Sequence, residues 1–121
     1  MGNQSVVLIL GNRKQQELKE MLFDLGFIPI ERGDMVQALD MLHHENFSAV
    51  FIDYDHVDID ALEFILNVRD MKLNLPVVII GEFKEKWEQT ALKKQDQVHY
   101  FQEIKDNHSF KTKLSEIVQH H

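Results

Sequence analysis

The chain has 121 residues, no cysteine and a formal net charge of −7, a length that suits one domain with its own core. The lack of cysteine excludes a disulfide scaffold and a thiolate metal site. The acidic excess argues against direct nucleic-acid binding, which needs clustered Lys and Arg. No apolar run is long enough for a membrane span and no leader pattern is present, so we expect a cytoplasmic protein without membrane contact. We treat 1–121 as one domain in which 1–4 and 119–121 are flexible or left from cloning.

The chain alternates five times between short apolar runs and stretches with helical periodicity. The expected strands are residues 5–10, 27–30, 49–52, 77–80 and 99–101. The expected helices cover residues 18–25, 35–42, 62–71, 84–95 and 110–118. Pro29 predicts that the second strand lies at an edge of the sheet, because proline cannot donate a hydrogen bond to a neighbouring strand.

Two helices carry more specific expectations. In the third helix, one face is expected to carry Leu62, Ile65, Leu66 and Arg69, with Phe64, Val68 and Met71 beside it. The fourth helix has only a thin apolar stripe, which depends on Phe83, Trp87 and Ala91. We therefore expect the fourth helix to be the least firmly docked.

Regular alternation of strands and helices predicts an α/β fold with a parallel sheet and helices on both faces. For a chain of this length, the flavodoxin-like (βα)5 strand order 2-1-3-4-5 is expected. Its switch point lies between the first and third strands, where ligands bind outside the carboxyl ends of the strands. Gly11, Asn12 and Asp53 should therefore converge at one cleft, with Gly81 on the same rim.

Asp53 ends the third strand and begins a loop that also holds Asp55, Asp58 and Asp60. Its position is where such folds place their chemistry, but an Asp at this point is also a common way to start a loop. Asp55 is a candidate to share a cation with Asp53. The alternative is that the loop acids are solvated, with Asp58 or Asp60 capping the next helix.

The stretch SAVFIDYDHVDIDALEFI, residues 48–65, resembles the third-strand region of bacterial response-regulator receiver domains. In that family the strand ends in an Asp that accepts a phosphoryl group, so the resemblance implies that Asp53 is the phosphoacceptor. It also implies three helpers: an acidic pair after the first strand that holds Mg²⁺, a Ser or Thr after the fourth strand, and a Lys after the fifth. A carboxylate that approaches a phosphoryl dianion needs such a cation to offset the like charge.

The sequence departs from the family pattern at all three helpers. Gly11 and Asn12 stand in place of the acidic pair, and Gly81 replaces the hydroxyl residue. Gln102, or Glu103 in a shifted alignment, takes the position of the Lys, and Lys105 lies beyond the strand unless its loop turns inward. The resemblance therefore implies a degenerate receiver, which is not an enzyme and works by binding, with Asp53 phosphorylation impaired or absent.

In the family, the face made by the fourth helix, fifth strand and fifth helix carries dimerisation or output contacts. The aromatic residues that the resemblance assigns to this face are Phe83, Trp87, Tyr100 and Phe101. It implies as partner a protein or fused output domain, a sensor kinase or a second copy of the chain, whereas the alternative is that Trp87 fills the core. Residues 75–82, LPVVIIGE, with Trp87 beyond them are also similar to the atypical receivers of σ54-dependent flagellar transcription activators, which would make this chain a fragment of a longer protein.

Two other functions remain open at this point. One is a working receiver in which Asp53 and Asp55 hold Mg²⁺ and Asp53 is phosphorylated. The other is a flavodoxin-like nucleotide binder, for which residues 11–14, Gly-Asn-Arg-Lys, offer one glycine and two bases after the first strand.

Overall fold

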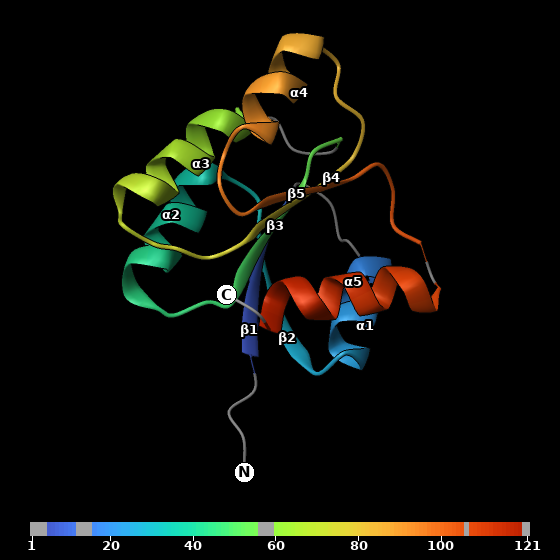
Figure 1. The fold of residues 1–121 in the computed structure, drawn as a ribbon. Helices are drawn as coiled ribbons and strands as arrows, with labels where there is room; N and C mark the ends of the chain where they lie inside the picture. The colour runs from blue at the N-terminus through green and yellow to red at the C-terminus, as the bar shows by residue number, and fades with distance from the viewer. Residues whose placement is uncertain (1–4, 12–15, 56–59, 106, 120–121) are drawn as a thin grey trace.

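The fold consists of five strands and five helices that alternate along the chain (Figure 1). The computed structural model describes residues 5–11, 16–55, 60–105 and 107–119. The strands are β1 (Ser5–Leu10), β2 (Phe27–Arg32), β3 (Ala49–Asp53), β4 (Val77–Ile80) and β5 (Val98–Phe101). The helices are α1 (Gln16–Asp24), α2 (Met35–His44), α3 (Ala61–Asp70), α4 (Lys86–Lys93) and α5 (His108–Gln119).

All five strands are parallel and their order in the sheet is β2-β1-β3-β4-β5. The predicted flavodoxin-like order is therefore confirmed. Pro29 lies in β2, opposite Val7 of β1, and β2 is an edge strand as predicted. Gly11 follows β1, and Asp53 is the last residue of β3. Because β1 and β3 are neighbouring parallel strands, the two residues lie at the same edge of the sheet.

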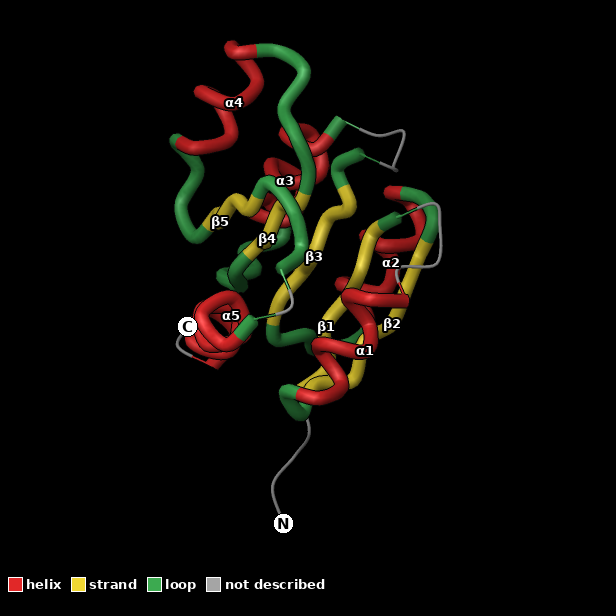
Figure 2. The backbone as a smooth tube through the Cα atoms, turned by 90° about the vertical axis from the view of Figure 1, so that its right-hand side faces the viewer, coloured by secondary structure: helices red, strands yellow, loops and turns green. Residues whose placement is uncertain are grey.

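Helices cover both faces of the sheet, so the core has two layers (Figure 2). One cluster joins the sheet to α2, α3 and α4, and the other joins it to α1 and α5. Alternate residues of a strand point to opposite faces. In β1, Leu8 and Leu10 belong to the first cluster, whereas Val7 and Ile9 belong to the second. The strands β1, β3 and β4 are consequently apolar on both faces.

The predicted face of the third helix is wrong. The residues of α3 that are buried against the sheet are Ala61, Phe64, Ile65 and Val68, and Leu66 is 47% exposed. The helix begins after Asp60, whose side chain accepts a hydrogen bond from the backbone N–H of Glu63. The cap fixes the start of the helix, and the 61/64/65/68 series follows the i, i+3, i+4 spacing of one helix face. Asp60, one of the two expected caps, thus fills that role.

The fourth helix is shorter than predicted, and its anchor differs from the expected stripe. Leu92 is its fully buried residue, whereas Trp87 is 64% exposed. The alternative in which Trp87 fills the core is therefore wrong. Two strands are also longer than predicted, since β2 continues to Arg32 and β5 begins at Val98. At the end of the chain, α5 runs to Gln119.

Within the described ranges, no helix has both the length and the apolar character needed to cross a lipid bilayer.

Candidate functional site

Asp53 is the buried acidic residue at the carboxyl end of β3. Its side chain is 6% exposed and packs beside Gly11, the residue that follows β1. A Cβ atom placed on Gly11 would lie 3.2 Å from Asp53 Cβ and 3.6 Å from Oδ2. The backbone N–H of Gly11 donates to the carbonyl of Arg32 at 2.9 Å, which ties this turn to the end of β2. The lack of a side chain at Gly11 therefore lets the turn after β1 pack closely against the Asp53 side chain.

Asp55 lies at the same rim but faces the end of β4. Its Oδ1 accepts a hydrogen bond of 3.0 Å from the backbone N–H of Glu82. The carboxylate lies where a side chain on Gly81 would have to go, because a Cβ atom there would be 2.8 Å from Asp55 Oδ1 and 3.0 Å from Tyr54 Cβ. Gly81 also has a φ of 143°, a conformation that residues with a side chain rarely adopt. Asp55 thus occupies the space beside the end of β4.

The end of β5 carries an amide at the rim. Gln102 follows Phe101, which is opposite Ile80 in the sheet, and so comes next to Gly81. Its Nε2 donates to Glu82 Oε1 at 2.7 Å. Lys105 is exposed and lines a separate groove of about 330 Å³ between the end of β5 and the start of α5, together with Gln102 and Glu103. The inward reach of Lys105 toward Asp53 stays a prediction.

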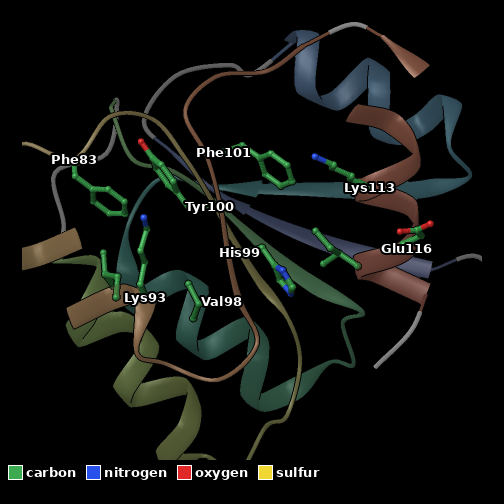
Figure 3. Close-up of a pocket in the computed structure, with 10 residues that line it drawn as sticks. Phe83, Lys93, Val98, His99, Tyr100, Phe101, Lys113 and Glu116 are labelled. Atoms are coloured by element: carbon green, nitrogen blue, oxygen red, sulfur yellow. The ribbon is translucent and has the colours of Figure 1, made fainter. Parts of the chain in front are cut away.

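A second hollow runs along β5, between α4 and α5, with a volume of about 530 Å³. Figure 3 shows Phe83 and Tyr100 on one side of β5, and Phe101 on the side of α5. Phe83 stacks on Tyr100 with ring centroids 4.4 Å apart, and Tyr54 meets Phe83 edge to face at 5.2 Å. Phe101 instead packs against Phe110 of α5 at 4.8 Å. The four aromatic residues assigned to this face are therefore divided between the two sides of the sheet.

The ionisable side chains of β5 differ from their ordinary states. Burial raises the pKa of Tyr100, and the negative charges of Glu82 and then Asp55 raise it further, while a backbone hydrogen bond from Phe83 lowers it. Lys93 lies over the ring of Tyr100, 6.0 Å from its centroid. Burial also lowers the pKa of His99, which points toward the α5 side. The negative charges of Glu82 and Asp55 at the rim therefore act on Tyr100, which lines the hollow along β5. We call this hollow the β5 groove.

The described residues supply part of a magnesium site. Mg²⁺ prefers octahedral oxygen ligands and is usually held by one or two carboxylates with water and phosphate. Asp53 supplies one buried carboxylate, but Asp55 Oδ1 already accepts from a backbone N–H and faces Gly81. Among the residues that the structure describes, no group of three His, Asp or Glu side chains is placed to hold a metal ion. The shared cation expected for Asp53 and Asp55 stays a prediction.

Several sequence-based candidates lie outside the described residues. Asn12, Arg13 and Lys14, on which the missing acidic pair and the nucleotide-binding alternative depend, are among them, and so is Asp58. Sequence reasoning missed two described residues that matter at the rim. Tyr54 follows Asp53 in the segment expected to be a loop, yet it is buried and packs against Phe83. Glu82 donates its backbone N–H to Asp55 and accepts a hydrogen bond from Gln102 with its carboxylate. Alternate residues of a strand point to the same face, so extending β3 by one residue places Tyr54 in the core with Val50 and Ile52.

No protein-family model and no curated protein sequence matches this chain. Solved structures do match over nearly its whole length. A CheY-like response regulator receiver domain from Methylobacillus flagellatus has a TM-score of 0.74 and 20% identity, over 97% of this chain and all of that one. The chemotaxis response regulator CheY4 of Vibrio cholerae has a TM-score of 0.70 and 15% identity, over 96% of this chain and 99% of that one.

A third match is the receiver domain of a sensor histidine kinase from Pseudomonas aeruginosa, whose structure has a magnesium ion in the active-site cleft. Its TM-score is 0.73 and its identity 16%, over 97% of this chain and 96% of that one. At these identities the likeness concerns the fold. The chain has the fold of response-regulator receiver domains, as the sequence resemblance implied.

Proposed function

We propose that this chain is a receiver-like signalling module that acts through protein contacts, and that phosphorylation of Asp53 is impaired or absent. The observation that carries the proposal is the place of Asp55. Its carboxylate fills the space beside Gly81 and accepts the hydrogen bond of the Glu82 N–H. A negatively charged group thus already lies on the β4 side of the rim.

The charges and donors at the rim support this proposal. A phosphoryl group on Asp53 would bring further negative charge, which needs cations or hydrogen-bond donors aimed at it. The Glu82 N–H is used by Asp55, and the Gln102 amide donates to Glu82 Oε1. Gly81 has no hydroxyl group to offer. None of these three positions carries the ammonium group of a Lys or the hydroxyl group of a Thr.

The surface along β5 is the proposed contact site for a partner. It combines a groove of about 530 Å³ with the exposed ring of Trp87 on the neighbouring helix, and Trp and Tyr dominate the energetics of many interfaces. An output domain, a sensor kinase or a second copy of the chain are the kinds of partner that this role requires. The proposal includes a cytoplasmic location, and the link to flagellar activators stays a prediction.

A second candidate function is a working phosphoacceptor that uses Mg²⁺. Asp53 favours it, since this residue ends β3 at the switch point, buried beside Gly11. The Pseudomonas receiver domain of the same fold carries magnesium in its cleft. In this chain Asp53 would be the ligand and acceptor, and bound Mg²⁺ would supply positive charge against the phosphoryl oxygens.

Beryllofluoride with Mg²⁺ separates the two functions, because it forms a phosphoryl-like adduct with a receptive aspartate. We expect the backbone amide spectrum of the wild-type chain to be unchanged when both are added. The control is Asp53→Asn under the same conditions. Perturbed amide signals around Asp53 that disappear in Asp53→Asn would replace the proposal with the phosphoacceptor function.

A further inference from the structure

We propose that Asp55 is an internal latch, a side chain that permanently holds the segment Gly81–Phe83 and thereby fixes the aromatic wall of the β5 groove. The aromatic wall is the stacked pair of Phe83 and Tyr100, which line the groove, with the buried ring of Tyr54 edge to face against Phe83. This inference rests on the proposed function for its biological meaning, since it assigns that module one fixed state. The contacts that form the latch are all between described residues, and they can be tested without a partner.

The first part of the latch is the grip on the backbone. The Asp55 carboxylate accepts the Glu82 N–H at 3.0 Å, and it enters the space that the missing side chain of Gly81 leaves. Gly81 itself has a φ of 143°, a conformation that residues with a side chain rarely adopt. A hydrogen bond from a backbone N–H to a carboxylate is among the stronger ones. Asp55 therefore restrains both the path of the chain and the next peptide group.

The second part is the link to the aromatic wall. Tyr54 and Asp55 are consecutive, and so are Glu82 and Phe83. Asp55 binds the N–H of Glu82, and Tyr54 contacts the ring of Phe83, so the two segments are joined by two neighbouring contacts. The Tyr54 N–H donates to the Ile80 carbonyl at 2.9 Å, which extends the β3–β4 ladder by one bond. The Tyr54 ring then meets Phe83 at 5.2 Å. The position of Phe83 thus follows from the same pair of segments that the carboxylate joins.

The wall continues to β5 from the other side. Phe83 stacks on Tyr100 at 4.4 Å, and Glu82 Oε1 accepts from Gln102 Nε2 at 2.7 Å. The segment Gly81–Phe83 is consequently held from the end of β3 and from the end of β5. Negative charge from Glu82 and Asp55 reaches the Tyr100 hydroxyl and contributes to its raised pKa. The hydroxyl of Tyr100 therefore reports on the Asp55 charge.

A covalently fixed carboxylate has a consequence for regulation. A phosphoryl group can be added and removed, whereas the Asp55 side chain is part of the chain and is always present. The segment Gly81–Phe83 then has no released state that depends on modification. The surface offered by Phe83 and Tyr100 is constant, and a partner would bind it at all times.

Asp55→Ala and Asp55→Asn test the latch. Amide hydrogen exchange at Glu82 is measured by NMR, and the pKa of Tyr100 by a titration of isotope-labelled tyrosine, which separates it from Tyr54. In Asp55→Ala we expect exchange at Glu82 to be roughly tenfold faster and the pKa of Tyr100 to fall. Asp55→Asn keeps an acceptor oxygen, so protection of Glu82 should be retained while the pKa of Tyr100 still falls. Asp70→Asn, an exposed acid at the end of α3, is the matched control for charge.

Unchanged Glu82 exchange in Asp55→Ala, or an unchanged pKa of Tyr100 in that variant, would overturn the latch. If Asp55→Ala does not fold, Gly81→Ala decides, because its Cβ atom would displace the Asp55 carboxylate, and unchanged exchange at Glu82 in that variant would overturn the latch. These readouts are independent of Asp53. Should Asp53 form a beryllofluoride adduct while Asp55→Ala still loosens Glu82, the proposed function would fail and the latch would stand.

Discussion

At the carboxyl edge of the sheet, the carboxylate of Asp55 occupies the space beside Gly81 in which any other residue at position 81 would place its Cβ atom. The distance from that Cβ position to Asp55 Oδ1 is 2.8 Å, and to Asp55 Cγ it is 2.9 Å. Real Cβ atoms do not approach neighbours so closely, and something must shift. The observed position of the Asp55 carboxylate therefore requires a glycine at position 81.

Gly81→Ala should therefore destabilise the protein by about 1–3 kcal/mol. Part of this cost is backbone strain at positive φ, and part is the displacement of Asp55. Gly26→Ala is the matched control, since Gly26 also has positive φ, 93°, but a Cβ atom there meets nothing within 4 Å. Urea unfolding followed by circular dichroism measures both. An equal cost at the two glycines would show that the contact with Asp55 is unimportant.

Leu92→Ala and Trp87→Ala should have very different effects on stability. Leu92 is fully buried and anchors α4, so its truncation should cost about 2–5 kcal/mol. Trp87 is 64% exposed, and its truncation should change stability by less than about 0.5 kcal/mol. Thermal and urea unfolding followed by circular dichroism give both values. A large loss for Trp87→Ala would mean that this ring supports the fold rather than a surface.

Arg69→Met should destabilise the protein by about 1–3 kcal/mol. The guanidinium donates to three backbone carbonyls, those of Leu73 at 3.2 Å, Leu75 at 3.0 Å and Asp96 at 2.7 Å. It therefore joins the end of α3 to the turn before β5. Arg69→Lys keeps the charge but lacks the planar fork, and should lose most of the same stability. Wild-type stability in Arg69→Lys would contradict this bridging role.

Acidification should destabilise the wild-type protein partly through His99. Burial lowers the pKa of His99 in the folded state, so the unfolded chain binds the proton more readily. The resulting stability is present above the unfolded pKa of about 6.5 and is lost as the pH falls through the lowered folded pKa. The urea midpoint of His99→Asn should therefore drop less than that of the wild type between neutral and mildly acidic pH. His43→Asn, at an exposed site, is the control, and an equal drop in all three proteins would contradict the assignment.

Much of the fold followed from the sequence, because its signals are local. Two-sided apolar runs such as Ser5–Leu10 indicate buried parallel strands, and Pro29 indicated the edge. The rotation of α3 did not follow, because Leu66 is apolar and completes a plausible helical stripe although it faces outward. Only the start of the helix after Asp60 and its tertiary packing determine which stripe is buried.

The site could be predicted in position but not in geometry. The switch-point rule predicted that Gly11 and Asp53 would lie together at the end of β1 and β3, and they do. The direction of Asp55 could not be predicted, since a side chain in a loop turns toward whichever partner the tertiary fold brings close. Here that partner is the Glu82 N–H, 27 residues further along the chain. The space beside Gly81, which Asp55 fills, was indicated in the sequence only by the absence of a side chain at that position.

The most direct measurement of the central claim is the intact mass of the protein after incubation with a small phosphoryl donor such as phosphoramidate and excess Mg²⁺. A conventional receiver domain treated in parallel shows that the reagents work, and Asp53→Asn shows whether any modification is on that residue. The account predicts that the wild-type chain stays unmodified under conditions in which the conventional receiver gains one phosphoryl group. A gain of one phosphoryl group by the wild-type chain, absent in Asp53→Asn, would contradict it.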